Sequence, residues 1–564
     1  LNSGNPWKKE IVRLIDALDE IMGISEAGED FRFDEDTLTD CMSEFLKNMT
    51  VQSHVNRNLT RLELCYISEV VRSNITSRLD DALEGNVDKK LLGDGKGSGG
   101  YYTESELTAL SGALDVFEID VLNMEGDDLV DKVKEQLLTL NELASPLEIY
   151  RGKTKLEVIY PSAIVSGLLS DELDSVLLDE EGGDPMIEKG LLQYIKENKT
   201  RYDQSEIATL IDSLNNFGVE SFEELENLDF NSVKGKEDKI GKICESRIIR
   251  GVFTLQIKNS NELGADHPLA YEGEPYKLGL RMLRIEEIES LVGLLNAVNG
   301  DGKDVNIENQ FFDNVKLKHI KQFTFNENDN VRSYLLLSAT SDSILRTEQL
   351  IVNGELIDDY GNVNDREVLA LLNAFLAVEG ENVNLGDWND KEASIAYPEK
   401  KDRAVALESQ LVRAKITEQI IERNTSTTMY VEKYNLRQFE RYGHEGDNNV
   451  RYLLSAEELE ALMDALDVCG GGNSFALPDL TFNGVLETYR SLGEQGGSMY
   501  LEKLFNTDIL RYKVSELIIK NCGVSGRLNE VYAISTAGGV KTVEETTSRS
   551  VDRADAEQAL KAFS

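Results

Sequence analysis

Residues 103–118 read TESELTALSGALDVFE, and the prediction of the fold starts from this stretch. In it, Glu106 is followed by apolar residues one, four, seven and eight positions later, ending at Leu114. Residues at this spacing lie on one stripe of a helix with 3.6 residues per turn. The stretch therefore predicts an amphipathic helix with one face to bury.

The same pattern occurs six times along the chain, at spacings of about 80 to 100 positions by subtraction of residue numbers. In four copies a short polar residue stands three positions before the glutamate, which predicts a capping box. In such a box the glutamate side chain reaches back to the first amide of its own helix. We therefore interpret the repeated glutamate as a helix-start device and not as a catalytic acid. The glutamates are Glu10, Glu106, Glu206, Glu287, Glu367 and Glu458, and the short polar residues are Thr103, Asp203, Asn364 and Ser455.

A second element recurs 44 to 62 positions after each glutamate, by the same subtraction. It consists of two large apolar residues followed by arginine, and most copies have Ser, Thr or Asp a few positions upstream. Aliphatic residues at helical spacing follow, so each copy predicts a second capped helix. Ion pairing or packing of the aliphatic stem explains one arginine per copy better than an anion site does. The arginines are Arg72, Arg151, Arg250, Arg346, Arg413 and Arg511.

Short segments rich in β-branched and aromatic residues lie between the predicted helices. Such segments predict small hairpins, although a short apolar run can also continue a helix. The segments are 155–160, 251–257, 322–325, 429–434 and 531–535.

We therefore predict a mainly α fold: a tandem array of about six diverged α-rich repeats with short β-hairpins, extended or solenoid-like. Two arrangements stay open, a continuous stack that shares cores and a row of compact beads. The glycine-rich stretch 93–100 (GDGKGSGG) favours beads at that boundary. The predicted repeats span residues 1–95, 96–196, 197–276, 277–357, 358–447 and 448–540, and a C-terminal helical tail spans 541–564.

Charge restricts the partners of the chain. Its 564 residues include 59 Lys and Arg against 103 Asp and Glu, for a net charge of −44. A field of this sign repels phosphate backbones and anionic lipid, so we expect no nucleic-acid partner. We also expect no membrane insertion within this segment, because no stretch approaches the length of uncharged chain that spans a bilayer. The five cysteines have no CxxC or zinc spacing, and we interpret them as mostly buried thiols.

Motifs that carry chemistry are weak in this sequence. Gly95, Gly97 and Gly100 fit GxGxxG, but no strand leads into them and no Ser or Thr follows Lys96 as a phosphate-binding loop requires. The histidines are scattered and no GxSxG is present. We predict no catalytic or cofactor-binding residues. Metal ligands are left unknown, with calcium as a candidate at the acidic loops. Those loops contain Asp34, Glu35 and Asp36; Asp179, Glu180, Glu181 and Asp184; Asp301 and Asp304; and Asp387 and Asp390.

A capped acidic helix, as at 103–107, followed by a Ser-x-aliphatic-aliphatic-Arg helix, as at 246–250, resembles tandem repeats of very large acidic bacterial surface or scaffold proteins. The resemblance covers nearly the whole chain up to about residue 540. It implies an architecture and, by analogy, a role.

We predict a non-enzymatic structural, spacer or protein-interaction segment within a larger protein, acting through protein partners or self-assembly. One alternative is a cell-surface adhesin or ligand-binding protein with its site in one repeat, for which the aromatic-rich stretch 429–452 is the candidate. Another alternative is a hydrolase with a spatially assembled site. An extracellular or cell-surface location is slightly favoured over the cytoplasm.

Overall fold

The computed structural model describes residues 6–22, 45, 48–84, 87–119, 128–144, 150–178, 185–260, 267–272, 281–300, 306–307, 311–348, 362–386, 395–423, 429–433, 435–440, 450–470, 474–537 and 540–563. The chain divides into two compact units. Unit 1 comprises residues 1–257 and 272–285, and unit 2 comprises residues 258–271 and 286–564. Both units are mainly helical, as the sequence predicts.

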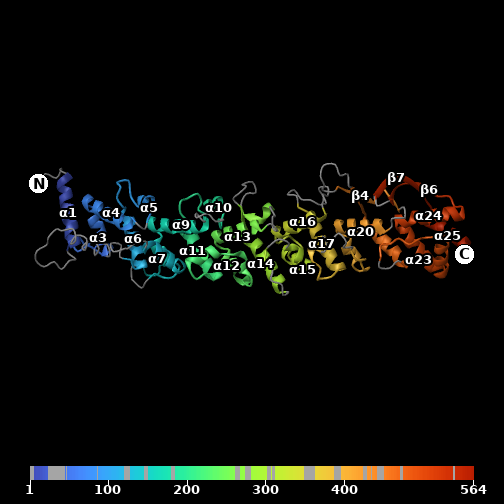
Figure 1. Ribbon diagram of the computed structural model, residues 1–564, viewed down its shortest axis with the longest axis horizontal. Helices are drawn as coiled ribbons and strands as arrows, with labels where there is room; N and C mark the ends of the chain where they lie inside the picture. Colours follow the sequence, from blue (N-terminus) through green and yellow to red (C-terminus); the bar gives the residue numbers. More distant parts are fainter. Residues whose placement is uncertain are drawn as a thin grey trace. The chain divides into compact units, whose positions relative to one another are not determined.

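Unit 1 is built from helices that pack in neighbouring groups. They are α1 (Pro6–Met22), α3 (Arg61–Tyr66), α4 (Glu69–Leu83), α5 (Lys89–Asp94), α6 (Glu104–Phe117), α7 (Asp128–Gln136), η2 (Leu137–Thr139), α8 (Lys155–Ile159), α9 (Ala163–Leu178), α10 (Lys189–Ile195), α11 (Gln204–Phe217), η4 (Phe222–Asn227), η5 (Phe230–Val233), α12 (Glu237–Ile243) and most of α13 (Arg247–Asn259). Helix α1 packs on α3 and α4 (Figure 1). Helix α6 packs on α8 and α9.

Unit 2 adds strands to the same kind of helix grouping. Its helices are η6 (Pro268–Ala270), most of α14 (Ile285–Gly300), η7 (Phe312–Asn314), α15 (Leu317–Thr324), α16 (Tyr334–Glu348), α17 (Asp365–Val378), α19 (Arg403–Ala406), α20 (Gln410–Arg423), α21 (Ala456–Val468), α22 (Phe482–Ser491), α23 (Gly493–Asn506), α24 (Asp508–Cys522) and α25 (Arg553–Phe563). Helix α17 packs on α19 and α20, and α21 packs on α23 and α24.

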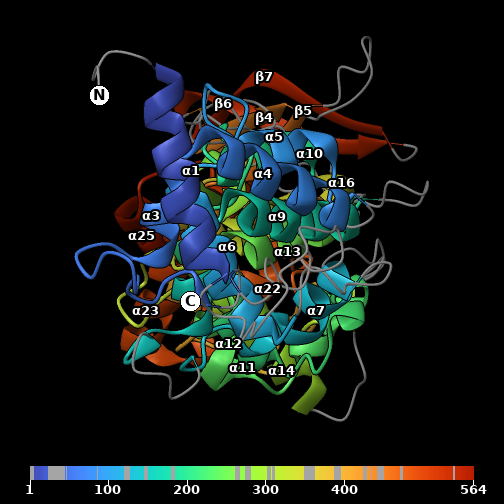
Figure 2. The same ribbon diagram turned by 90° about the vertical axis from the view of Figure 1, so that its left-hand side faces the viewer.

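The strands form small antiparallel sheets. Strands β3 (Met429–Glu432), β6 (Arg527–Ala537) and β7 (Val540–Ser550) form one sheet in the order β3-β6-β7, with Met429 opposite Ile534. Strands β4 (Leu436–Glu440) and β5 (Val450–Leu454) form a second sheet. Figure 2 shows β6 and β7 side by side as a long ribbon. The two-residue strands β1 (Tyr271–Glu272) and β2 (Met282–Leu283) precede α14.

The apolar stripes predicted from the sequence form the cores. In α6, Leu107, Leu110 and Phe117 are each only 1 % exposed. The same positions of α11 and α21 are buried as well. The six patterned stretches are therefore helices whose striped faces are buried, with α1 as a partial exception, because Ile11 is 53 % exposed whereas Ala17 is fully buried.

Two of the five predicted hairpin segments are strands, because 429–434 contains β3 and 531–535 lies in β6. The other three were wrong: 155–160 contains α8, 251–257 lies in α13, and 322–325 overlaps the end of α15. The apolar residues of 155–160 and 251–257 are buried on helices, so periodicity over so few residues did not separate the two states, and helix was the alternative that the sequence left open.

The predicted helical tail at 541–564 is wrong in its first part, because β7 extends to Ser550 before α25 begins at Arg553. β-Branched residues such as Val543, which lies opposite Ile534, favour a strand there and pair with β6.

The glycine-rich stretch at 93–100 is a closed turn and not an open joint. The Gly97 amide donates to the carbonyl of Tyr101 at 2.8 Å, and the Gly100 amide donates to the carbonyl of Gly97 at 2.9 Å. Gly100 has a φ of +79°, a conformation that favours glycine. The turn therefore joins the α5 end directly to α6.

Candidate functional site

The repeated glutamate of α6 binds the start of a different helix. The Ser162 hydroxyl donates to Glu106 Oε1 at 2.6 Å, the Ala163 amide donates to Oε2 at 2.7 Å, and the Ile164 amide donates to Oε1 at 3.2 Å. These donors form the N-terminus of α9, where amides lack partners within the helix. A carboxylate there also favours the positive end of the helix dipole. Glu106 thus joins α6 to α9.

All six repeated glutamates, hereafter the cap glutamates, make this contact. Each accepts a hydrogen bond from a Ser or Thr hydroxyl and from one or two of the amides that follow it. We call these six residues the cap hydroxyls. The pairs and their oxygen–oxygen distances are Glu10–Ser68 2.7 Å, Glu106–Ser162 2.6 Å, Glu206–Ser246 3.1 Å, Glu287–Ser333 2.5 Å, Glu367–Ser409 2.6 Å and Glu458–Thr507 2.6 Å.

The predicted capping boxes are therefore wrong about the partner of the glutamate side chain. Thr103 and Ser455 do accept from the amide of the glutamate three positions later, as a box requires. The glutamate side chain, however, does not return to its own helix start. Asn364 accepts from the Arg366 amide, and Asp203 makes no cap hydrogen bond with its side chain. Spacing within one helix could not reveal a partner 40 or more positions away.

The balance between burial and hydrogen bonding shifts the pKa values of individual cap glutamates in opposite directions. Hydrogen bonding from Ser68 is the main cause that lowers the pKa of Glu10, aided by the amides of Val70 and Glu69 against a smaller burial effect. At Glu458, burial and then the nearby Asp508 carboxyl outweigh the hydrogen bonds and raise the pKa to about 7. Burial also raises the pKa of Glu367. Glu10 and Glu458 thus accept hydrogen bonds from similar donors, yet the pKa of Glu10 is lowered and that of Glu458 is raised.

A second hydroxyl, eight residues after the cap hydroxyl, was not predicted. In five of the six copies it accepts a hydrogen bond from the backbone amide four residues before the next cap glutamate, or before Asp555 in the last case, whereas in the fourth copy the Ser341 hydroxyl donates to the carbonyl of Val363 at 3.5 Å. We call these residues the junction hydroxyls. The pairs and distances are Thr76–Tyr102 3.3 Å, Ser170–Tyr202 3.3 Å, Thr254–Leu283 3.0 Å, Thr417–Leu454 3.1 Å and Ser515–Val551 3.1 Å. The eight-residue spacing of hydroxyl residues was the sequence signal that could have revealed them.

Two junctions carry the same side-chain triad. The Tyr102 hydroxyl donates to Asp80 at 2.6 Å, and Lys96 donates to the other oxygen of that carboxylate at 2.6 Å. At the next junction Tyr202 donates to Asp174 at 2.7 Å, and Lys196 also donates to Asp174. In both triads the ammonium group lies over the tyrosine ring. Each triad therefore joins the segment just before a cap glutamate to the helix that carries the aspartate.

The repeated arginines follow the cap hydroxyls in only four copies. Arg72, Arg250, Arg413 and Arg511 stand four residues after theirs, but Ser166 and Leu337 occupy that position in the second and fourth copies. The assignments to Arg151 and Arg346 were therefore wrong. Ion pairing is confirmed at Arg250, which lies 2.6 Å from Glu272, and at Arg511, which lies 2.6 Å from Glu432.

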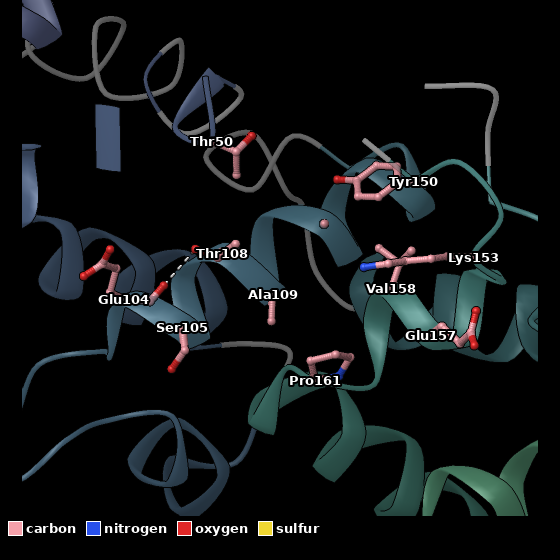
Figure 3. A pocket seen from close by; sticks show the side chains of 11 residues that line it. Thr50, Glu104, Ser105, Thr108, Ala109, Tyr150, Lys153, Glu157, Val158 and Pro161 are labelled. Carbon is pink, nitrogen blue, oxygen red and sulfur yellow. Dashed lines mark hydrogen bonds between the residues drawn. The ribbon is translucent and has the colours of Figure 1, made fainter. Parts of the chain in front are cut away.

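A groove of about 800 Å³ opens between α6 and α8 in unit 1 (Figure 3). Glu104, Thr108 and Ala109 line it from α6, and Lys153 and Glu157 line it from the chain at α8. The Thr108 hydroxyl donates to the Glu104 carbonyl at 2.9 Å. The lining residues include no histidine or cysteine, so they offer no imidazole or thiol for acid–base or nucleophilic chemistry.

The candidate metal ligands are not placed. All the acidic-loop residues predicted as calcium candidates lie outside the described residues. Within the described ranges, no group of three or more His, Cys, Asp or Glu side chains is arranged to hold a metal ion. Cys65 and Cys244 are buried, Cys469 and Cys522 are partly exposed, and Cys41 lies outside the described residues.

The aromatic-rich stretch 429–452 is described only in part. Tyr430 is half-buried, and its ring centroid lies 6.4 Å from that of Tyr512. Tyr434 and Tyr442, and the side chains of Phe439 and Tyr452, lie outside the description. Tyr430 therefore packs against a helix of its own unit.

Among the helices that the structure describes, none has both the length and the apolar character that crossing a bilayer requires. Comparison of the chain with protein-family models, with curated proteins and with solved structures found no match.

Proposed function

We propose that this chain is a non-enzymatic structural or protein-interaction segment built of tandem helical repeats. The observation that carries the proposal is the use of the repeated polar residues. Every cap glutamate is bonded to a cap hydroxyl at 3.1 Å or less. The residues that recur most regularly thus join helices, as expected of residues that maintain the fold of a structural protein.

The proposed repeat has a simple physical basis. In each repeat the cap glutamate lies on the first helix and binds the start of the second helix, which begins at the cap hydroxyl. The apolar stripe between these two helices is buried. The junction hydroxyl of the second helix then accepts the amide just before the following first helix. Each hydrogen bond to a buried amide costs free energy when it is lost, so these contacts favour one spacing between copies.

We propose further that neighbouring copies share cores in a solenoid-like stack and are not separate beads. Arg403 supports this arrangement, because it is only 3 % exposed and bonds Asp464 at 2.9 Å and Asp467 at 2.7 Å in the following copy. The closed turn at 93–100 supports it at an earlier junction. The six repeat boundaries given by the sequence stay predictions.

Small-angle X-ray scattering of the full chain tests the extended array. A compact globule of this length has a radius of gyration of about 24 Å by the usual size scaling. We expect a value well above this, which millimolar calcium leaves unchanged. A value near the globular estimate would contradict the array, and a calcium-dependent change would indicate metal binding at the acidic loops.

A ligand-binding role is the second candidate, and the groove between α6 and α8 is the observation that favours it (Figure 3). Its apolar lining includes Ala109, Val158 and Pro161, beside the charged Lys153 and Glu157. A thermal-shift screen with short peptides tests this role. Ligands that stabilise the chain, but not an Ala109→Tyr variant with a filled groove, would support it. The hydrolase alternative gains no support from the lining residues of this groove.

A further inference from the structure

Helix α8 lies between two grooves of unit 1. The first is the groove between α6 and α8 described above, which Glu157 lines from the α8 side and Glu104 lines from the α6 side (Figure 3). The second groove, of about 830 Å³, lies between α8 and α11. Glu157 lines this groove as well. The two grooves are therefore adjacent and share one carboxylate.

The two grooves use the same surface of successive first helices. The residues one position before, two positions after and six positions after the cap glutamate line the groove in both copies. They are Ser105, Thr108 and Gly112 around Glu106, and Ser205, Ala208 and Asp212 around Glu206. Tandem-repeat proteins use such repeated surfaces to bind extended partners.

The charges around the grooves define the chemistry of a partner. Among the described residues that line the two grooves, four are carboxylates and Lys153 is the only cation. Apolar residues such as Val158 and Leu156 line them too. Charge complementarity therefore favours a partner that carries both basic and apolar groups, whereas nucleic acid and anionic lipid are repelled. The carboxylates are Glu104, Glu157, Asp203 and Asp212.

Two of these carboxylates are held in place by hydrogen bonds within unit 1. The Thr154 amide donates to Glu157 Oε2 at 2.8 Å, as part of the capping box that starts α8. The Asn141 side-chain amide donates to Asp212 Oδ1 at 2.7 Å. Both acidic side chains are nevertheless exposed, and a carboxylate accepts more than one hydrogen bond. They can bind a basic side chain without first being ordered, which lowers the entropic cost of binding.

We propose that the two grooves beside α8 together bind one extended, basic segment of a partner protein. Its arginine or lysine side chains pair with Glu157 and Asp212, and its small apolar side chains pack against Ala109 and Val158. Alternate side chains of an extended segment point to opposite sides, so one segment can make both kinds of contact. The inference rests on the ligand-binding role proposed above for the first groove, and it adds the second groove and the chemical class of the partner.

Fluorescence anisotropy with a labelled ten-residue peptide of alternating arginine and alanine tests this proposal. When extended, the peptide spans about 33 Å, more than the roughly 20 Å between the outer axes of three helices packed side by side. We expect the peptide to bind the full chain. We expect Glu157→Gln and Asp212→Asn each to raise the Kd by about twofold to fivefold, the usual loss for one exposed ion pair. Glutamine also fits a capping box, so α8 should keep its start.

Glu224→Gln is the matched control for Glu157→Gln. Glu224 is exposed in the same unit and accepts from the Glu220 amide at 2.8 Å, but it lines neither groove. This variant should leave the Kd unchanged. An equal effect of Glu224→Gln, equal binding of a peptide with glutamate in place of arginine, or no binding at all would overturn the proposal.

Filling one groove at a time tests whether one segment crosses both. Ala109→Tyr fills the first groove and Ala208→Tyr fills the second, and each should weaken binding of the ten-residue peptide by about tenfold or more. Far-ultraviolet circular dichroism checks that the variants keep their helix content. Loss of binding in only one of these variants would overturn the shared segment. A neutral or acidic peptide whose stabilising effect is lost in Ala109→Tyr would keep the ligand-binding role and overturn the basic partner.

Discussion

The carboxylate of Glu106 lies 2.6 Å from the hydroxyl of Ser162, a residue 56 positions later in the chain. Glu106 is 4 % exposed and Ser162 is fully buried, so this contact sits inside unit 1 and not on its surface. Two amides of α9 bind the same carboxylate. One side chain thus satisfies the start of a helix that is remote in sequence.

Glu106→Gln should destabilise unit 1 by about 1.5 to 3 kcal/mol, the usual contribution of hydrogen bonds to a charged group. The amide nitrogen of glutamine cannot accept from the α9 donors. Urea unfolding and hydrogen exchange at the Ala163 and Ile164 amides measure the loss. Glu104→Gln is the matched control, because Glu104 is exposed on the same turn of α6 and should change stability by less than about 0.5 kcal/mol. Equal effects of the two substitutions would contradict the bridging role of Glu106.

Thr417→Val keeps the shape of a junction residue but removes its hydroxyl. Thr417 is fully buried and accepts from the Leu454 amide at 3.1 Å. We expect a cost of about 1 to 3 kcal/mol, because a buried amide is left without its acceptor. Hydrogen exchange at the Leu454 amide should speed up in the variant. Unchanged protection of that amide would show that the junction does not depend on the hydroxyl.

Tyr102→Phe should cost about 1.5 to 3 kcal/mol, and Tyr101→Phe much less. Tyr102 is fully buried and its hydroxyl donates to Asp80 at 2.6 Å, so the variant loses a hydrogen bond to a carboxylate. The neighbouring Tyr101 contacts Arg72 through its ring, which phenylalanine retains. Thermal unfolding of both variants compares the two directly. A larger loss for Tyr101→Phe would be inconsistent with the triad.

The contributions of Glu458 and Glu10 to the free energy of unfolding should change with pH in opposite directions. Burial, followed by Asp508, raises the pKa of Glu458 to about 7, so its contribution to stability is complete below about pH 4.5 and is lost as the pH rises to about 7. Hydrogen bonding from Ser68 lowers the pKa of Glu10, so its contribution is present above about pH 4.5 and is lost as the pH falls below this. Carboxyl carbon chemical shifts followed by NMR measure both titrations.

Glu458→Gln serves as the control for this pH dependence. The variant lacks the ionisable group, so exchange of the Ile509 amide, which binds Glu458 at 3.1 Å, should lose its dependence on pH between about 4.5 and 7 beyond the intrinsic exchange rate. A Glu458 carboxyl that titrates near or below the ordinary glutamate value would contradict the expected sign.

The sequence predicted the mainly helical class and the six first helices, because apolar spacing at 3.6 residues per turn depends only on local geometry. Its hairpin predictions failed at 155–160, 251–257 and 322–325, where short apolar runs belong to helices. It also assigned the second helix of the second copy to Arg151 and missed Ser162. The segment 145–149 beside Arg151 lies outside the described residues.

That Glu106 and its counterparts recur in register and stand at helix starts follows from their spacing along the chain. What these glutamates bind depends on how the helices pack. A glutamate at a helix start can bind the first amides of its own helix or those of a remote helix. Which of the two it binds depends on which unsatisfied amides the fold brings near its carboxylate. The same holds for Ile11: its position in the sequence pattern matches that of Leu107, yet Leu107 is 1 % exposed and Ile11 is 53 % exposed. Local spacing specifies a helix and its apolar stripe, whereas partners far along the chain are set by how the helices pack.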